Sequence, residues 1–310
     1  MTKESIASAY KALQATICSD LEKLDGKSSF SSDHWERAEG GGGLTRVIKE
    51  GDLLEKGGVA FSAVHGEVSP AMKSQLQLEG ESFFATGISI VLHPHSPHVP
   101  IIHMNVRYFE LDNGTYWFGG GIDLTPHYII PAQATLFHQR LKTICDKYDT
   151  SFYPKHKAWA DTYFHIPHRN ESRGIGGIFF DHLSENNTNL SKEQLFAYCS
   201  ELASSFVSIY SEQAVLGRNK EIEPHHLAWR NLRRGRYVEF NLVHDRGTKF
   251  GLFSGGRTES ILMSLPPIAN WEYQYEAKEG SEEAKTLEWL SPSRASGTDE
   301  GRVKSEENEK

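Results

Sequence analysis

An alternation with a period of two between residues 101 and 109 constrains the fold most strongly. Ile102, Met104 and Val106 are apolar, and the polar residues His103, Asn105 and Arg107 stand between them. Because successive side chains of a strand point to opposite faces, this pattern predicts a strand with one buried and one polar face. Residues 112–114 read Asp-Asn-Gly, which favours a tight hairpin turn. The sequence therefore predicts an antiparallel pair that returns through residues 115–118.

The other periodic segments predict a single α+β domain over residues 1–290. Strands are expected at residues 44–49, 58–64, 85–93, 236–243 and 248–253, and helices at 4–24, from Pro131 for about 18 residues, at 155–164 and at 191–216. The predicted strands and helices do not alternate along the chain, so a parallel sheet is not expected. The expected architecture is a large, mostly antiparallel sheet flanked on both faces by helices. Residues 291–310 are a polar tail with little to bury, and we expect them to be disordered.

Composition excludes several classes of protein. The three cysteines (Cys18, Cys145 and Cys199) are scattered, which argues against a disulfide framework or a structural zinc site. The formal net charge is −8 with one basic stretch at 229–257, a distribution that suits a small anionic ligand better than nucleic acid. No apolar run reaches the roughly 20 residues of a membrane span. The first 30 residues lack the features of a targeting segment, so a cytoplasmic location is expected.

The polar face of the predicted strand is a candidate binding surface. On the preceding strand Ser89 and His93 also share a face, four residues apart. Polar side chains are costly to bury without partners, so this face should meet water or a polar ligand. A solvated antiparallel face is the plain alternative.

Histidines crowd the segment HPHSPHVPIIH, which contains His93, His95, His98 and His103. Two of them spaced along a strand could hold a metal ion. Two prolines interrupt the segment, however, and no carboxylate stands at chelating spacing. Fifteen histidines in the chain also make chance clusters common. From the residues alone, metal binding stays an alternative.

Two glycine-rich segments stand beside charged residues. Gly255 and Gly256 precede Arg257, where backbone N–H groups and a guanidinium could bind a carboxylate together. A glycine run at 119–121 leads to Asp123, which is either a turn residue or a buried carboxylate awaiting donors. No Ser–His–Asp pattern, dinucleotide-binding fingerprint or Cys–His pair supports the common hydrolase or nicotinamide chemistries.

Taken together, six segments resemble the aerobic, oxygen-dependent coproporphyrinogen III oxidases. They are WERAEGGGG, HMNVRYFE, WFGGGIDLTPHY, HRNESRGIGGIFFD, LRRGRYVEFNLVHDRGTKFGL and GGRTESILMSLPP, in this order along nearly the whole chain. The resemblance implies a homodimer whose interface includes residues 237–271, between Tyr237 and Trp271. It also implies oxidative decarboxylation of the A- and B-ring propionates of coproporphyrinogen III to vinyl groups, with O2 as the acceptor.

By matching these segments, the family's substrate-contacting positions fall on Ser89, Asn105, Val106, Arg107, Asp123, Gly255, Gly256 and Arg257. The catalytic positions would be His103, Asp123 and Arg107. The planar guanidinium of an arginine can donate two hydrogen bonds to a propionate, and Asp123 could accept hydrogen bonds from pyrrole N–H groups. His103 would assist a proton transfer.

No redox cofactor is expected, because the electron-rich porphyrinogen can itself react with O2. Four histidines sometimes assigned as metal ligands in this family match His93, His103, His138 and His168. A metal-dependent oxidase is thus one alternative. A catalytically silent tetrapyrrole-binding protein is the alternative from another class, and a nucleic-acid-binding role for the basic stretch is disfavoured by its alternating apolar residues.

Overall fold

A seven-stranded antiparallel sheet dominates the computed structural model, which describes residues 1–70, 72–73, 79–253 and 256–291. Its strand order is β1-β2-β3-β4-β5-β6-β9. The strands are β1 (Ser31–Glu36), β2 (Gly41–Lys49), β3 (Leu54–Glu67), β4 (Ser82–Pro94), β5 (Ile101–Leu111), β6 (Tyr116–Thr125) and β9 (Gly177–Leu183). A separate two-stranded hairpin consists of β7 (His165–Ile166) and β8 (Glu171–Ser172).

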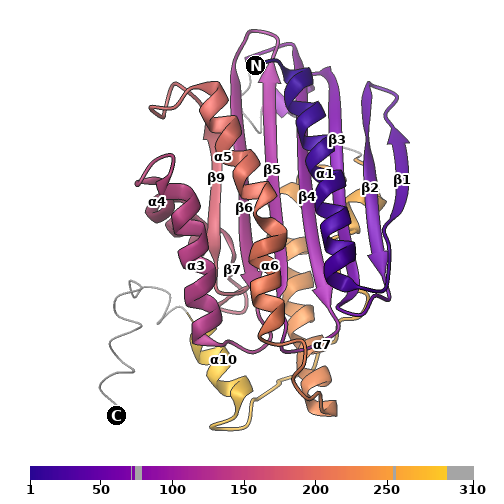
Figure 1. The fold of residues 1–310 in the computed structure, drawn as a ribbon, viewed down its shortest axis with the longest axis vertical. Coiled ribbons are helices and arrows are strands. Elements are labelled where there is room, and N and C mark those ends of the chain that lie inside the picture. The colour runs from indigo at the N-terminus through magenta and orange to yellow at the C-terminus, as the bar shows by residue number, and fades with distance from the viewer. Residues whose placement is uncertain (71, 74–78, 254–255, 292–310) are drawn as a thin grey trace.

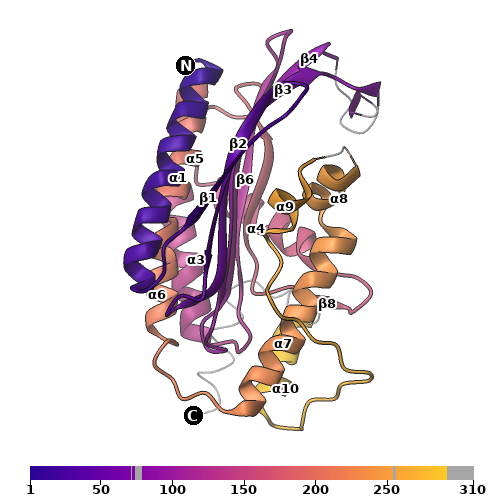
Figure 2. The ribbon, with the colours of Figure 1, turned by 90° about the vertical axis from the view of Figure 1, so that its right-hand side faces the viewer.

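Helices cover both faces of this sheet, so the predicted α+β architecture is confirmed (Figure 1). Figure 2 shows α1, α3, α5 and α6 along one face and α7, α8 and α9 along the other. The helices are α1 (Lys3–Asp25), α3 (Pro131–Asp146), α4 (Phe152–Tyr163), α5 (Lys192–Ser204), α6 (Phe206–Val215), α7 (Pro224–Glu239), the π-helix η1 (Phe240–His244), α8 (Arg246–Phe253), α9 (Thr258–Leu262) and α10 (Glu282–Leu290).

Local sequence signals explain where several elements begin and end. The Thr2 side chain caps α1, and Gly26 ends it in the left-handed conformation, with φ of 83°. The hairpin between β5 and β6 turns at Gly114, whose φ is 84°, as the Asn-Gly pair predicts. Among the described residues, no helix combines the length and apolar character needed to cross a bilayer.

The main core lies on the face that α1, α3, α5 and α6 cover. The even positions of β5, with the matching side chains of β4 and β6, are at most 1% exposed there. They are Ile88, Ile90, Leu92, Ile102, Met104, Val106, Phe118, Ile122 and Leu124. The alternation that predicted β5 therefore also identified its buried face correctly.

Two strands predicted near the C-terminal end are wrong. Residues 236–243 lie at the end of α7 and in η1, and residues 248–253 lie in α8. The apparent alternation of Val238, Phe240 and Leu242 does not correspond to burial, since Phe240 is buried while Leu242 is 43% exposed. The buried residues follow helical spacing instead, at Trp229, Leu232, Arg233, Tyr237 and Phe240.

A single helix predicted over residues 191–216 is divided into α5 and α6 at Ser205. The Ser204 and Ser208 hydroxyls donate to backbone carbonyls three residues earlier, a type of contact that often bends helices. The sequence also gave no indication of β1, β9 or α10. The predicted disordered tail, residues 291–310, falls outside the described residues except for Ser291.

Candidate active site on the polar face of the sheet

The second face of the sheet gathers most of the polar residues that the sequence singled out. Ser89 of β4 pairs with Asn105 of β5, and His103 of β5 pairs with Asp123 of β6. Because paired residues share a face, Arg107 joins them two positions beyond Asn105. All of these side chains except Asp123 are half-buried, so the face remains accessible.

At the centre of this face, His103 and Asp123 form a hydrogen-bonded pair. The His103 ring donates from Nδ1 to Oδ1 of Asp123 over 2.8 Å. The Asp123 side chain is only 2% exposed, whereas that of His103 is 18% exposed. A carboxylate that accepts from one ring nitrogen fixes the tautomer, which leaves the Nε2 nitrogen to accept or donate a proton.

Arg173 also binds Asp123, and the sequence analysis did not identify it. Its Nη2 lies 2.6 Å from Oδ1 and 2.7 Å from Oδ2, and its Nε lies 3.1 Å from Oδ2. Both side chains are 2% exposed. Burial alone would raise the pKa of Asp123, but the charge of Arg173 and the hydrogen bonds from His103 and Arg173 outweigh it and lower the pKa.

Three aromatic rings surround the Arg173 guanidinium. Its carbon lies 4.4 Å from the ring centre of Phe164, 4.6 Å from that of Phe240 and 4.8 Å from that of Tyr237. Phe240 begins the π-helix η1, a rare element that is often found at functional sites. Cation–π contacts of this kind stabilise a desolvated guanidinium. Arg173 lies in the segment HRNESRGIGGIFFD, whose charged residues were the available signal.

Arg107 extends from the same face toward solvent. Its Nη2 lies 2.8 Å from Oδ2 of Asp181 on β9, and its Nη1 donates to Asn105 Oδ1 over 3.2 Å. Gly119 lies between the two charged side chains on β6, where an added Cβ would stand 2.6 Å from Asp181 Oδ1. The Arg107 side chain remains 39% exposed, so it can still meet a ligand.

Arg257 lies on the same side of the sheet, at its opposite edge. It donates to Asp33 of β1 and to Ser260 Oγ of α9, and Ser260 Oγ lies 2.8 Å from Thr45 Oγ1 of β2. Four strand spacings separate β1 from β5, which is about 19 Å. Arg107 in turn reaches Asp181 on β9, so the two arginines lie over well-separated strands, which suits a large ligand with carboxylates at its periphery. Gly256 donates its N–H to the Gly251 carbonyl, and Gly255 falls outside the described residues.

Val106 differs from the other predicted substrate contacts. Its side chain is fully buried in the core on the opposite face. Only its backbone could approach a ligand on the polar face.

The four histidines that matched proposed metal ligands do not share a site. His93 donates to the Ser264 carbonyl over 2.8 Å, and burial, with the charge of Arg234, lowers its pKa well below the usual value. His138 contacts the Ile175 carbonyl, and His168 donates to Glu239. Within the described part of the chain, no three His, Cys, Asp or Glu side chains form a group that could hold a metal ion. These residues therefore do not fit a common metal.

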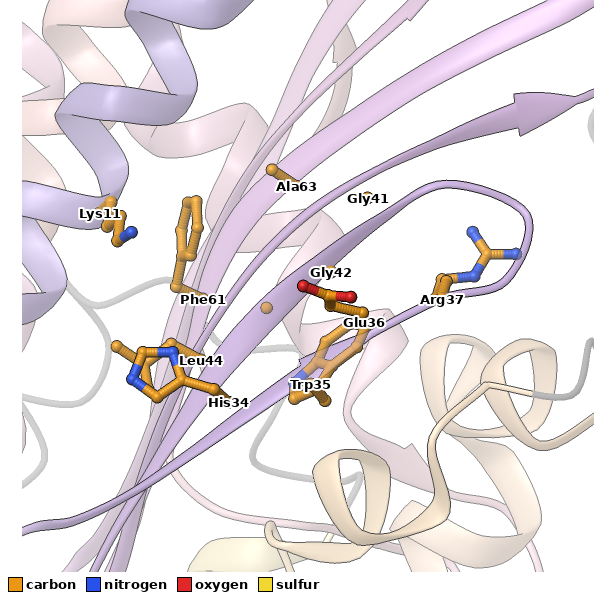
Figure 3. A pocket seen from close by; sticks show the side chains of 11 residues that line it. Lys11, His34, Trp35, Glu36, Arg37, Gly41, Gly42, Leu44, Phe61 and Ala63 are labelled. Carbon is orange, nitrogen blue, oxygen red and sulfur yellow. The ribbon is translucent and has the colours of Figure 1, made fainter.

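Another hollow of the described structure has a different lining. A groove of about 480 Å³ separates α1 from the edge strands, as Figure 3 shows. Its lining includes Lys11, His34, Glu36, Leu44 and Phe61. It contains none of the predicted site residues, and its walls do not hold a buried acid–base pair. The chemistry of His103 and Asp123 is therefore the stronger indication of function.

The fold and this face together define an enzyme-like α+β protein with a hydrogen-bonded acid–base pair between two arginines that suit carboxylates. Residues 5–295 match the family model described as coproporphyrinogen III oxidase. The chain therefore belongs to the coproporphyrinogen III oxidase family, as the resemblance predicted.

Two curated relatives are similar to the chain over most of its length. It is 48% identical over 292 residues to the oxygen-dependent coproporphyrinogen-III oxidase of Drosophila melanogaster. The aligned region covers 90% of this chain and 74% of the relative. It is 47% identical over 291 residues to the mitochondrial oxygen-dependent coproporphyrinogen-III oxidase of Homo sapiens. This aligned region covers 89% of the chain and 63% of the relative. Both relatives agree with the predicted class of oxygen-dependent oxidoreductase.

Proposed function

We propose that this chain converts the A- and B-ring propionates of coproporphyrinogen III to vinyl groups, giving protoporphyrinogen IX in haem biosynthesis. In each step a propionic acid side chain loses CO2 and two hydrogens, and O2 accepts the hydrogens as hydrogen peroxide. Membership of the family supports this reaction. The observation that carries it is the hydrogen-bonded His103–Asp123 pair on a polar face bounded by Arg107 and Arg257.

The two arginines would bind propionates of the substrate. A guanidinium donates two parallel hydrogen bonds to a carboxylate, which fixes orientation as well as position. Arg107 is partly exposed beside Asn105, and Ser89 lies across from Asn105. Arg257 would bind a second propionate near the β1 edge, and Gly255 and Gly256, which precede it in the sequence, stay predicted contacts. The backbone of Val106 completes the predicted contacts.

His103 is the group that we assign to proton transfer. Its Nδ1 is committed to Asp123, so Nε2 would remove or deliver a proton at the reacting propionate. Arg107 would hold that propionate within reach, two residues along the same strand face. Asp123 would keep the imidazole oriented throughout.

The hypothesis that Asp123 accepts pyrrole N–H groups directly meets a geometric obstacle. Both carboxylate oxygens already accept from Arg173, and the side chain is 2% exposed. Anchoring of the ring would therefore require the Arg173 ion pair to open. The observed geometry favours the orienting role of Asp123.

We further propose that no metal or organic cofactor is required and that O2 is the co-substrate. The separate hydrogen bonds of His93, His103, His138 and His168 support this proposal. The test is aerobic turnover of coproporphyrinogen III by exhaustively metal-stripped protein, with CO2 and vinyl product measured. Full activity is expected. Activity that disappears and returns with Mn, Fe or Cu would establish a metal-dependent oxidase, and binding without CO2 release would establish a silent binding protein.

We propose a homodimer whose interface includes residues 237–271. Large apolar side chains are exposed in this region at Leu242, Val243, Leu252, Phe253, Ile268 and Trp271. A second copy of the chain would bury them. Sedimentation of the intact chain should give twice the monomer mass, and Val243→Asp should shift it toward the monomer. Monomeric native protein would contradict the proposal.

The cytoplasm is the cellular location that we propose. The human relative is named as mitochondrial, so fractionation of cells that express the native gene is the deciding measurement. Recovery of the activity with an organelle fraction would overturn this proposal.

A further inference from the structure

We propose that Arg173 is a positioning residue for the reaction: it fixes the carboxylate of Asp123 and, through it, the imidazole of His103, without touching the substrate. This inference rests on the proposed function, because it assumes that His103 transfers a proton. It assigns a role to an arginine that neither the motif matching nor the acid–base pair itself identifies.

The first support is the geometry of the hydrogen bonds between the Arg173 guanidinium and the Asp123 carboxylate. Arg173 donates to both oxygens of Asp123, at distances of 2.6 Å, 2.7 Å and 3.1 Å. A guanidinium bound to both oxygens prevents rotation of the carboxylate, because rotation would break more than one charge-assisted hydrogen bond. The same Oδ1 accepts from His103 Nδ1. The plane of the carboxylate therefore determines where the imidazole ring can point.

The second support is that the protein holds Arg173 itself in place. The rings of Phe164, Tyr237 and Phe240 surround its guanidinium, and its backbone N–H donates to the Phe164 carbonyl over 2.9 Å. The Arg173 side chain is 2% exposed, whereas that of Arg107 is 39% exposed. A substrate carboxylate could therefore reach Arg107 but not Arg173.

The third support is electrostatic. The groups that face Asp123 are His103 and Arg173, and Tyr237 and Asp245 in turn lie near Arg173. Without the positive charge and hydrogen bonds of Arg173, the pKa of Asp123 would rise, because one of the two groups that lower it against burial would be gone. The carboxylate would then become protonated at a higher pH and would no longer accept from His103. Loss of Arg173 should therefore remove activity first on the acidic side of the pH profile.

A purely structural role is the competing explanation, because any buried ion pair destabilises the fold when one partner is removed. Arg233 offers a matched control for this explanation. Its side chain is 3% exposed, its Nη1 lies 2.9 Å from Glu171 Oε1, and its guanidinium lies 5.6 Å from the Trp229 ring. Arg233 makes no contact with Asp123 or His103 among the interactions of the described residues. It thus reproduces the burial and charge pairing of Arg173 but not its place in the site.

The experiment compares Arg173→Met, Arg173→Lys and Arg233→Met in the intact enzyme, with kcat, KM, the pH profile of kcat and chemical unfolding measured for each. Arg173→Met should lower kcat by about 100-fold, with KM changed by less than about threefold, because a misplaced acid–base group affects the chemical step. Its acidic limb should move to higher pH. Arg233→Met should lose comparable stability while it keeps the kcat and pH profile of the parent.

Two results would overturn the inference. The first is an Arg173→Met variant whose kcat and pH profile match those of Arg233→Met. If Arg173→Met does not fold, Arg173→Lys decides, because lysine keeps the charge but cannot donate to both carboxylate oxygens in the same geometry; an unchanged kcat would then overturn it. His103→Gln distinguishes a failure of the proposed proton transfer from a failure of the role of Arg173. Normal kcat in His103→Gln would refute the assigned proton transfer, whereas impaired His103→Gln with normal Arg173→Lys would refute the role of Arg173 alone.

Discussion

The two faces of the central sheet come from the same strands but differ in almost every physical respect. On β5, Ile102, Met104 and Val106 are fully buried against the helices α1, α3, α5 and α6. The alternate residues His103, Asn105 and Arg107 remain half-buried on the other face. One face thus removes apolar area from water, while the other presents groups that can titrate or bind ions.

This difference shows how the sheet separates stability from chemistry. Dense apolar packing on one face holds the strands in register and so supports the backbone of the other face. The polar face can then carry a buried charged pair, Asp123 and Arg173, whose desolvation would otherwise be costly. Substitutions on adjacent positions of one strand should therefore produce different kinds of defect.

The largest effect is expected on the apolar face. Phe118→Ala removes a fully buried ring and should lower the free energy of unfolding by about 3–5 kcal/mol, while kcat per folded molecule stays near that of the parent. Urea unfolding and active-site-normalised kinetics measure the two quantities. Asn105→Ala on the polar face is the control and should cost less than about 1 kcal/mol. A smaller loss for Phe118→Ala than for Asn105→Ala would contradict the division of roles.

The next effect is expected in catalysis. His103→Gln keeps a donor for Asp123 but removes the titrating nitrogen, so kcat should fall by about 100-fold while the free energy of unfolding changes by less than about 1 kcal/mol. Met104→Leu, one residue further along β5, should leave kcat unchanged because its side chain lies in the core. Steady-state kinetics and thermal unfolding of both variants test this contrast. Equal kcat values in the two variants would count against it.

A fall in pH should lower the free energy of unfolding through the carboxylate of Glu239. Burial raises the pKa of Glu239, but hydrogen bonds from Arg169, His168 and Trp271 outweigh it and lower the pKa from 4.5 to about 2. Because the pKa is lower in the folded state, the ionised group stabilises the fold above pH 4.5, and this contribution is lost as the pH falls toward about 2. Glu239→Gln should therefore flatten the pH dependence of the unfolding free energy in this interval. Urea unfolding at several pH values measures it.

The control for Glu239 is a carboxylate without such burial. Glu39 is 67% exposed beside Arg37, and Glu39→Gln should leave the pH dependence close to that of the parent. If both variants flatten the curve equally, the network around Glu239 has no special part in acid stability.

The smallest effect is expected at the partly exposed ion pair of Asp181 and Arg107 on the polar face. Asp181 pairs with Arg107 at 2.8 Å, and both are partly exposed, so the pair contributes little to stability. Asp181→Asn should release Arg107 for the substrate and lower KM by about threefold, with kcat nearly unchanged. Kinetics at two salt concentrations would separate charge from shape. A higher KM would mean instead that Asp181 aligns Arg107 for binding.

Much of the fold and part of the candidate site could be predicted from local patterns. The strand period identified β5 and its buried face, and the Asn-Gly pair located the hairpin before β6. Periodicity failed at Val238, Phe240 and Leu242, because a short alternating run cannot distinguish a strand from a helix that is buried on one side only. Arg173 was missed because its partner Asp123 lies 50 residues away in the sequence.

The sequence by itself determined which side chains of a strand share a face, since that depends only on the period of the extended backbone. It also determined the family, because six segments occur in a fixed order along the chain. Only the tertiary structure decided that Asp123 is buried, that Arg173 holds it and that three aromatic rings hold Arg173. Those contacts join β6, the end of α4, the segment after β8, α7 and η1. Their geometry depends on packing between elements that no local pattern specifies.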